Sequence, residues 1–172
     1  MQLDQAQASM SMRHFKEAAI ELRQVADALE REASQSGAAT SVRLRQDALS
    51  LRTIADKLSA GQEVRRRHLE RKVAWIDASL AGHYYAAATQ AWGEKQVAAA
   101  GAALAASARY AQRSLDATEY RVGRELAETV SYGDKLEEQS ATSLDAEFES
   151  HRQRVAAAIA AAEHAYARQP VD

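Results

Sequence analysis

The chain has 172 residues, of which 47% are apolar and 40 are alanine, with one proline and no cysteine. This composition is typical of long helices, and it excludes disulfides, thiolate nucleophiles and cysteine metal sites. The formal net charge of −2 hides an asymmetry, because residues 40–72 sum to +5 and residues 116–149 to −7. We expect these two segments to face each other within the fold.

The first elements are read from apolar residues at steps of three and four. A short helix is expected around Leu3, Ala6 and Met10, and a longer one over about 12–34, with Ser11 as its cap and Phe15 on its apolar face. The next helix is expected over about 41–60, capped by Thr40 or Ser41 and ended by Gly61.

One helical phrase is written twice. Residues 19–29 read AIELRQVADAL and residues 48–58 read ALSLRTIADKL, with six of eleven positions identical. The phrases predict two antiparallel helices in which the leucines of one pack over the alanines of the other. Within each phrase an arginine precedes an aspartate by four residues, an order that gives only a weak ion pair along one helix. The similarity is either an old duplication or chance.

The middle of the chain predicts two long helices. The first covers about 63–92 and is apolar on two faces, the second of which carries Trp75, Tyr85 and Trp92. Such a helix is usually central, or it lies at an oligomer interface. After a tight turn at WGEK (92–95), apolar or small residues recur every three or four positions from 104 to 136, with one stutter. This heptad pattern predicts one continuous helix over about 96–140.

A last helix is expected over about 143–168, with Asp145 in its first turn and Phe148, Val155 and Ile159 on its apolar face. The fold class is therefore all-α. We expect an elongated, antiparallel, coiled-coil-like bundle of about five or six helices, forming a single domain over 1–172 with frayed ends at 1–2 and 169–172.

Residues 81–114 resemble one tetratricopeptide hairpin. Tyr84 falls at the aromatic position of that family, Ala88 and Ala100 at its small positions, and Leu104 at a bulky position of its second helix. Gln112 stands where the family has its closing proline. Ala91 also stands where the family has an aromatic, so the resemblance implies a single helical hairpin over about a fifth of the chain.

No catalytic motif is present, and the chain is not expected to be an enzyme. It has no Gly-rich phosphate loop, no nucleophile elbow, no His-Glu-x-x-His and no Glu-x-x-His. We therefore expect no catalytic residue, no metal site and no cofactor. Glu147 and His151, four apart, can share one side of a helix. The candidate ligand-binding residues would line an internal pocket: Trp75, His83, Tyr84, Tyr85 and Trp92.

The densest basic run is EVRRRHLERK (63–72), but the negative net charge and the single nearby aromatic, Trp75, argue against nucleic acid as a partner. The first residues show no signal peptide, and no stretch is long and apolar enough to be a transmembrane segment. Cytoplasmic localisation is the expectation.

These features favour a non-enzymatic scaffold or protein–protein interaction protein. Its partner would be another protein or a second copy in a homo-oligomer, with the contact near Trp92. Two alternatives remain. One is a bundle that binds a small ligand or metal in the aromatic and histidine-lined pocket, and the other is an amphipathic coat protein on lipid or polymer surfaces.

Overall fold

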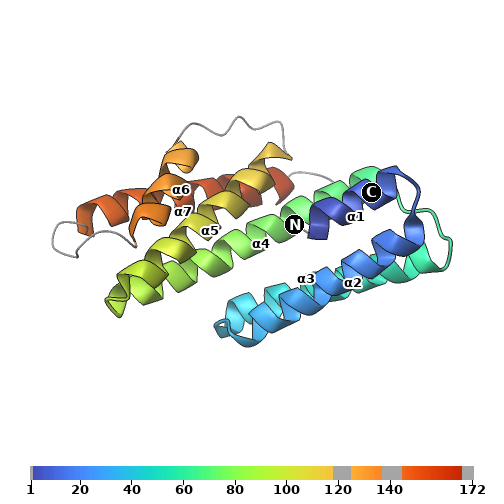
Figure 1. Ribbon diagram of the computed structural model, residues 1–172, viewed down its shortest axis with the longest axis horizontal. Helices are drawn as coiled ribbons and strands as arrows, with labels where there is room; N and C mark the ends of the chain where they lie inside the picture. Colours follow the sequence, from blue (N-terminus) through green and yellow to red (C-terminus); the bar gives the residue numbers. More distant parts are fainter. Residues whose placement is uncertain (1, 118–124, 137–144, 168–172) are drawn as a thin grey trace. The chain divides into compact units, whose positions relative to one another are not determined.

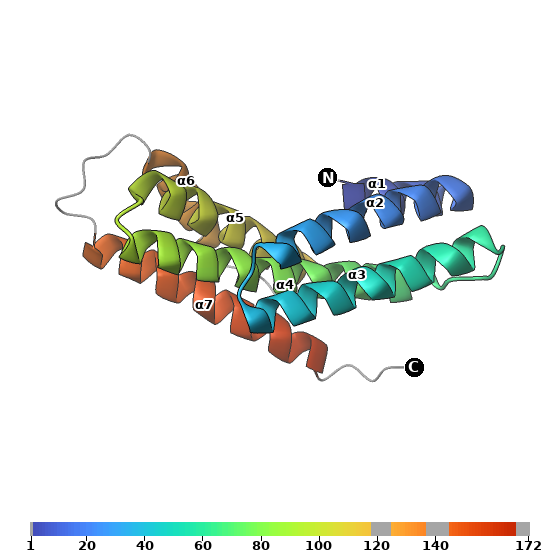
Figure 2. The same cartoon turned by 90° about the horizontal axis from the view of Figure 1, so that it is seen from below.

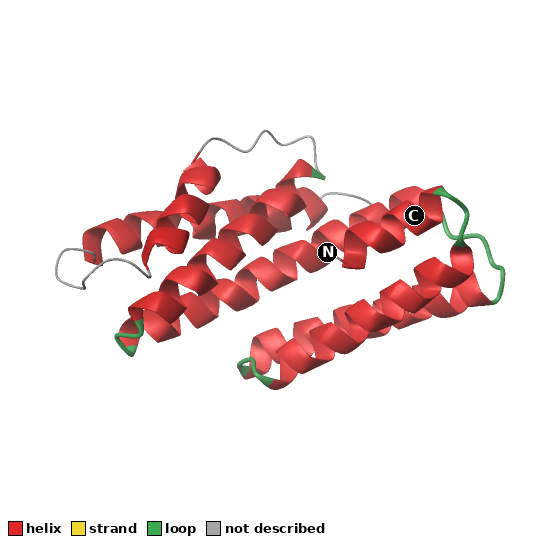
Figure 3. Ribbon diagram, in the orientation of Figure 1, coloured by secondary structure: helices red, strands yellow, loops and turns green. Residues whose placement is uncertain are grey.

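The computed structural model describes residues 2–117, 125–136 and 145–167, and within them it contains seven helices and no strand (Figures 1 and 3). The all-α class and the antiparallel packing of successive helices are confirmed. The chain divides into two compact units, Met1–Ile76 (unit 1) and Asp77–Asp172 (unit 2). The single domain over 1–172 stays a prediction. The ends expected to fray lie outside the described residues, except for Gln2 at the start of α1.

Unit 1 begins with α1 (Gln2–Ser11) and α2 (Phe15–Ser34). The predicted cap at Ser11 is wrong, because Ser11 still belongs to α1 and its hydroxyl donates to the Gln7 carbonyl. The chain reverses at Arg13, whose φ of 62° lies in the left-handed region, and the His14 N–H bonds back to the Ser9 carbonyl. Since the reversal places Phe15 at the very start of α2, its side chain is exposed rather than on the apolar face.

The repeated phrases form α2 and α3 (Ala38–Ser59), which pack side by side as an antiparallel hairpin (Figure 2). The leucine–alanine–leucine stripe of each phrase is buried, as the sequence predicted: Leu22, Ala26, Leu29, Leu51, Ala55 and Leu58. Helix α3 begins earlier than expected, with Gly37 as its N-cap and both Thr40 and Ser41 inside it. Gly61, at a φ of 71°, ends it as predicted, and the Gln62 N–H bonds to the Lys57 carbonyl.

Helix α4 (Arg66–Gly93) matches the predicted long helix over 63–92 and runs across the division between the units. The predicted tight turn after it is also confirmed. Lys95 has a φ of 60°, and the Gln96 N–H bonds to the Ala91 carbonyl at 2.8 Å. The chain therefore enters α5 (Val97–Asp116) immediately after α4.

The continuous helix predicted over 96–140 is wrong. Helix α5 ends at Asp116, and α6 (Glu125–Lys135) packs against it instead of extending it (Figure 1). Gly101 and Gly133 mark the contact, because a Cβ atom on Gly101 would lie 2.7 Å from the Gly133 carbonyl oxygen. These glycines therefore allow two backbones to approach closely.

The described residues of the predicted heptad stripe are nevertheless buried, divided between two helices. Leu104, Ala108, Ala111 and Leu115 lie on α5, and Leu126, Thr129 and Leu136 lie on or directly after α6. An apolar stripe that doubles back on itself buries the same residues as a straight one, which is why its period did not reveal the break. Positions 118 and 122 of the stripe lie outside the described residues.

Unit 2 is completed by α7 (Asp145–Ala167), close to the predicted 143–168. Asp145 lies in its first turn, and Phe148 and Val155 are buried, both as predicted, while Ile159 is partly buried. Most of the residues in the core of this unit are alanines. Alanine cores let helix axes lie close together but bury little area per residue.

Candidate interaction surface

The two copies of the repeated phrase are tied to each other by exchanged ion pairs. Arg23 of α2 bonds to Asp56 of α3 at 2.8 Å, and Arg52 of α3 bonds to Asp27 of α2 at 2.7 Å. Arg23 also donates to Ser59, and Arg52 also donates to Glu30. Glu30 and Ser59 are equivalent positions, since each directly follows one of the two phrases. The bonds therefore follow a local two-fold symmetry. The weak pairs expected along each helix are replaced by pairs between the helices.

These bonds have a clear electrostatic effect at one position. The hydrogen bond from Arg52 holds the pKa of the Glu30 carboxyl below its usual range. All of the paired groups remain substantially exposed. Exposed pairs add little stability, so they act mainly to fix the register of α2 against α3.

The bridges lie beside a broad exposed surface. On α2 the residues facing solvent recur at helical spacing, and those on α3 do the same. We call these two rows together the outer face: Glu17, Ile20, Gln24, Asp27 and Arg31 on α2, and Val42, Arg45, Leu49, Thr53 and Asp56 on α3. Because Arg23 and Arg52 each cross to an aspartate of the other helix's row, both rows lie on the same side of the hairpin.

The outer face carries large apolar side chains in water. The exposed fraction is 54% for Ile20, 56% for Val42 and 65% for Leu49. Met12 and Phe15, at the turn between α1 and α2, are also exposed, whereas the described part of unit 2 has no exposed large apolar residue. Single exposed apolar residues are ordinary, but all five large ones that are exposed in the described residues lie within residues 12–49.

The sequence-based predictions did not include these exposed apolar residues, although the sequence contains a pattern that indicates them. Ile20 and Leu49 occupy the same place in the two phrases, but they point away from the Leu-Ala-Leu stripe. An apolar residue on the polar side of an amphipathic helix has no partner within its own core. Its occurrence in both phrases is the pattern that indicates a surface.

Of the predicted pocket residues, Trp75 belongs to unit 1 and the other four to unit 2. Trp75 is half-buried, and the guanidinium of Arg43 lies 4.6 Å from the centre of its ring. The nearby Asp47 is almost fully buried and bonds to Lys72 at 2.7 Å. The same chain therefore covers part of Trp75.

His83 is buried, and its ring makes a T-shaped contact with the ring of Tyr84, with the ring centres 4.8 Å apart. Tyr84 in turn stacks on Tyr110 of α5, with ring centres 5.6 Å apart. A second bond ties the same two helices, because the Ser107 hydroxyl donates to the Ala81 carbonyl at 2.6 Å. His83 and Tyr84 thus take part in the packing of α4 on α5, and their role in ligand binding stays a prediction.

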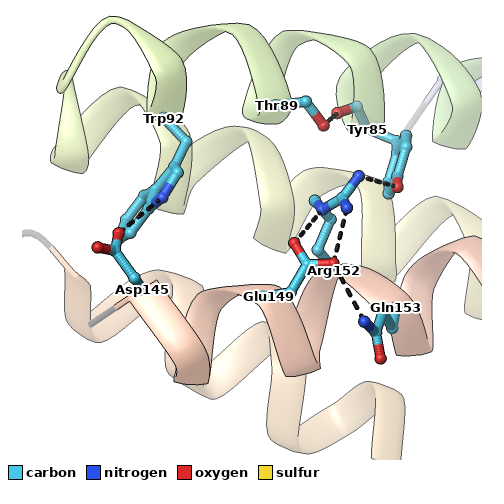
Figure 4. A network of polar contacts seen from close by, with 7 residues as sticks. All are labelled: Tyr85, Thr89, Trp92, Asp145, Glu149, Arg152 and Gln153. Carbon is cyan, nitrogen blue, oxygen red and sulfur yellow. Dashed lines mark hydrogen bonds and ion pairs between the residues drawn. The ribbon is translucent and has the colours of Figure 1, made fainter. Parts of the chain in front are cut away.

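Tyr85 and Trp92 point from α4 toward α7 (Figure 4). Arg152 donates to the Tyr85 hydroxyl at 2.7 Å and is itself held by Glu149. Trp92 stacks on Phe148 at 3.9 Å, and its ring N–H donates to Asp145 at 3.2 Å. The same chain therefore partly covers both aromatics, including Trp92, for which the sequence had suggested a contact with a second copy.

His151 of α7 lies against α6. It bonds to the Thr129 hydroxyl at 2.9 Å, and its ring stacks on Tyr132 at 4.2 Å. Burial, helped by the nearby Arg154, lowers the pKa of His151, and burial raises the pKa of Tyr132 to about 12. The sequence had placed His151 with Glu147 as a pair of side chains on one side of the helix, but its closest polar partner is on α6.

The basic and acidic segments bond within their own units. In the basic segment, Arg52 and Lys72 pair with acids of unit 1. In the acidic segment, Asp134 pairs with Arg109 and Glu128 pairs with Arg154. The expectation that segments 40–72 and 116–149 face each other stays a prediction.

Within residues 2–117, 125–136 and 145–167, no three His, Asp or Glu side chains gather as a metal ion would require. In the same ranges no helix is long and apolar enough to cross a membrane. No family model, curated protein or solved structure matches the chain. The hairpin implied over 81–114 is present as the end of α4 and most of α5, while the tetratricopeptide resemblance itself stays a prediction.

Proposed function

We propose that this chain is a non-enzymatic helical interaction protein that binds a protein partner through the outer face of α2 and α3. The carrying observation is the exposure of Ile20, Val42 and Leu49 on the outer face of the hairpin. Apolar patches bordered by charge are typical of protein-binding surfaces.

The charges of the hairpin support the same proposal. Arg23, Asp27, Arg52 and Asp56 lie between the levels of Ile20 and Leu49 along the hairpin and are already paired with each other. Groups that are ordered before binding lose less conformational entropy when a partner docks, so they favour specific association. The ligand-pocket alternative has less support, because Tyr84, Tyr85 and Trp92 each pack against a neighbouring helix.

The test compares three tagged full-length proteins for the partners they retain from a lysate of the source cell. The outer-face variant carries Ile20→Glu and Leu49→Glu. The control carries the same two charges at exposed positions of unit 2, as Ala86→Glu and Ala102→Glu. We expect a partner retained by the wild type and the control but lost from the outer-face variant. An identical set of partners for all three proteins would refute the proposal.

A further inference from the structure

One end of unit 1 combines exposed apolar side chains with unpaired cations. Helix α2 begins at this end and α3 finishes there, so the turn before α2 and the loop after α3 lie at the same end of the unit (Figures 1 and 2). We call these two segments, residues 11–17 and 60–68, the basic end.

The apolar side chains of the basic end are Met12, with an exposed fraction of 60%, and Phe15, with 43%. The chain reverses between them at Arg13, so they flank a tight turn at the tip of the α1–α2 hairpin. Among the five large apolar residues that are exposed in the described ranges, these two lie off the outer face. The proposed protein-binding surface therefore does not account for them.

The charge of the basic end differs from that of the remaining chain. The two segments hold five basic and two acidic residues, a formal charge of +3, whereas the whole chain sums to −2, so the other residues carry −5. An anionic surface would therefore attract this end and repel the rest of the molecule. Such a charge distribution orients a protein before contact.

Most of these cations are also unengaged. Four of them are exposed and form no ion pair with a residue that the structure describes: Arg13, Lys16, Arg65 and Arg67. Arg66 pairs with Glu70 along α4, and the acidic Glu17 is already bonded to His14 at 3.0 Å. Binding an anion here breaks no ion pair of the four cations.

Two apolar side chains at a protruding turn, beside free cations, match the chemistry of an anionic lipid surface. The cations meet phosphate and carboxylate groups of the lipids, and the apolar side chains enter the boundary between headgroups and acyl chains. Nucleic acid would use the cations, but its phosphate backbone offers no apolar layer for Met12. The pairing of both features therefore favours lipid.

We propose that the basic end docks unit 1 on an anionic lipid surface, with Met12 and Phe15 inserted among the headgroups and the unpaired cations against the lipid phosphates. The attachment is peripheral and reversible, because it depends on two side chains and on charges that salt screens. Each basic residue close to such a surface raises the affinity about five-fold. This activity is separate from the protein binding proposed for the outer face.

Flotation of the full chain with vesicles tests the inference. One set of vesicles contains phosphatidylcholine alone, and the other contains about one third phosphatidylserine, an anionic lipid. We expect the wild type to bind the anionic vesicles about ten-fold or more tightly than the neutral ones. Binding should weaken when the salt is raised from about 0.1 M to about 0.5 M. A wild type that ignores anionic vesicles, or binds both sets equally, would overturn the inference.

Two variants and a matched control locate the contact. Arg65→Gln with Arg67→Gln should weaken binding to the anionic vesicles about ten-fold or more, and so should Met12→Gln with Phe15→Gln. The control, Arg31→Gln with Arg45→Gln, removes the same charge from exposed positions at the other end of the α2–α3 hairpin and should bind like the wild type. Circular dichroism should be unchanged in all three proteins. Variants that bind as well as the control would contradict the proposed contact, as would a wild type that binds a DNA duplex but no vesicle.

A fluorescent label reports insertion without altering the apolar pair. Because the chain has no native cysteine, Ser11→Cys takes one environment-sensitive label beside Met12, and Ala39→Cys takes one at the opposite end of the hairpin. We expect anionic vesicles to increase the emission of label 11 and to leave label 39 unchanged. The same response from both labels would refute docking through the basic end.

Discussion

Arg23 bonds to Asp56 while Arg52 bonds to Asp27, so each copy of the repeated phrase supplies the acid for the other's base. Within each helix the arginine and the aspartate are four residues apart, so they could instead have paired along the same helix. The pairing between helices makes the charges part of the register of the hairpin.

A double-mutant cycle on Arg23 and Asp56, each changed to alanine, should give a coupling of about 0.5 kcal/mol in the free energy of unfolding, as expected for an exposed pair. The cycle on Arg23 and Asp27, neighbours along α2, should give a smaller value. Urea unfolding of the single and double variants measures both. A larger coupling for Arg23 with Asp27 would mean that the pairs form along the helix after all.

Gly101→Ala should destabilise the protein by about 1–3 kcal/mol, the usual cost of overpacking. The new Cβ would lie 2.6 Å from Leu136 Cβ and 2.7 Å from the Gly133 carbonyl oxygen, so α5 and α6 would have to separate. Gly82→Ala is the control, since it lies inside α4 with no atom within 4 Å of the added Cβ. That variant should be more stable than the wild type by about 0.5–1 kcal/mol. Equal effects in denaturant melts would rule out a close α5–α6 contact.

Trp92→Ala should lower the free energy of unfolding by about 2–3 kcal/mol, somewhat less than the loss of a fully buried aromatic. The change removes the stack on Phe148 and the bond to Asp145. Trp92→Phe keeps a ring for stacking and should cost only about 1 kcal/mol, mostly the lost hydrogen bond. Thermal melts decide this, with sedimentation as a second readout. A Trp92→Ala protein that melts normally but dissociates would instead place Trp92 at a contact between copies.

The stability of the protein should fall as the pH drops below about 6.5 because of His151. Burial lowers the pKa of His151 in the folded chain, so the unfolded chain, with its ordinary value near 6.5, binds the proton more readily. The stabilisation is complete above that pH and is lost as the pH falls toward the folded value. Arg154 acts in the same direction as burial, while Glu147 and Glu128 oppose it.

Urea unfolding between pH 8 and pH 5 should show a smaller loss of stability in His151→Gln than in the wild type. An NMR titration gives the folded value directly, with the His151 signal assigned by its absence from the variant. A titration midpoint at or above 6.5 would contradict the prediction.

The sequence predicted the features that depend on period and on local conformation. The buried leucines of the two phrases, the end of α3 at Gly61 and the turn at WGEK all follow from side-chain spacing or from a few neighbouring residues. The break before α6 was missed, because glycine does not by itself end a helix, and Gly101 and Gly133 both lie within the stretch predicted as one helix. Their role appears only when two distant backbones are seen in contact.

The candidate ligand-binding residues were chosen by side-chain size, and their role in binding stays a prediction. Large aromatics were taken to indicate binding, but Tyr84, Tyr85 and Trp92 fill spaces between helices. Side-chain size indicates burial somewhere, but it does not identify the surface that provides it. The exposed Ile20 and Leu49 are smaller, and only their position opposite the core stripe distinguishes them.

The alanine-rich core of unit 2 has a calorimetric consequence. Each alanine that leaves this core exposes little apolar surface, and the heat capacity change of unfolding scales with the apolar surface exposed. The heat capacity change of unfolding per residue should therefore lie below the value of about 12–15 cal/mol/K that is usual for globular proteins. A smaller increment flattens the dependence of stability on temperature, so these helices should lose stability only gradually on cooling as well as on heating.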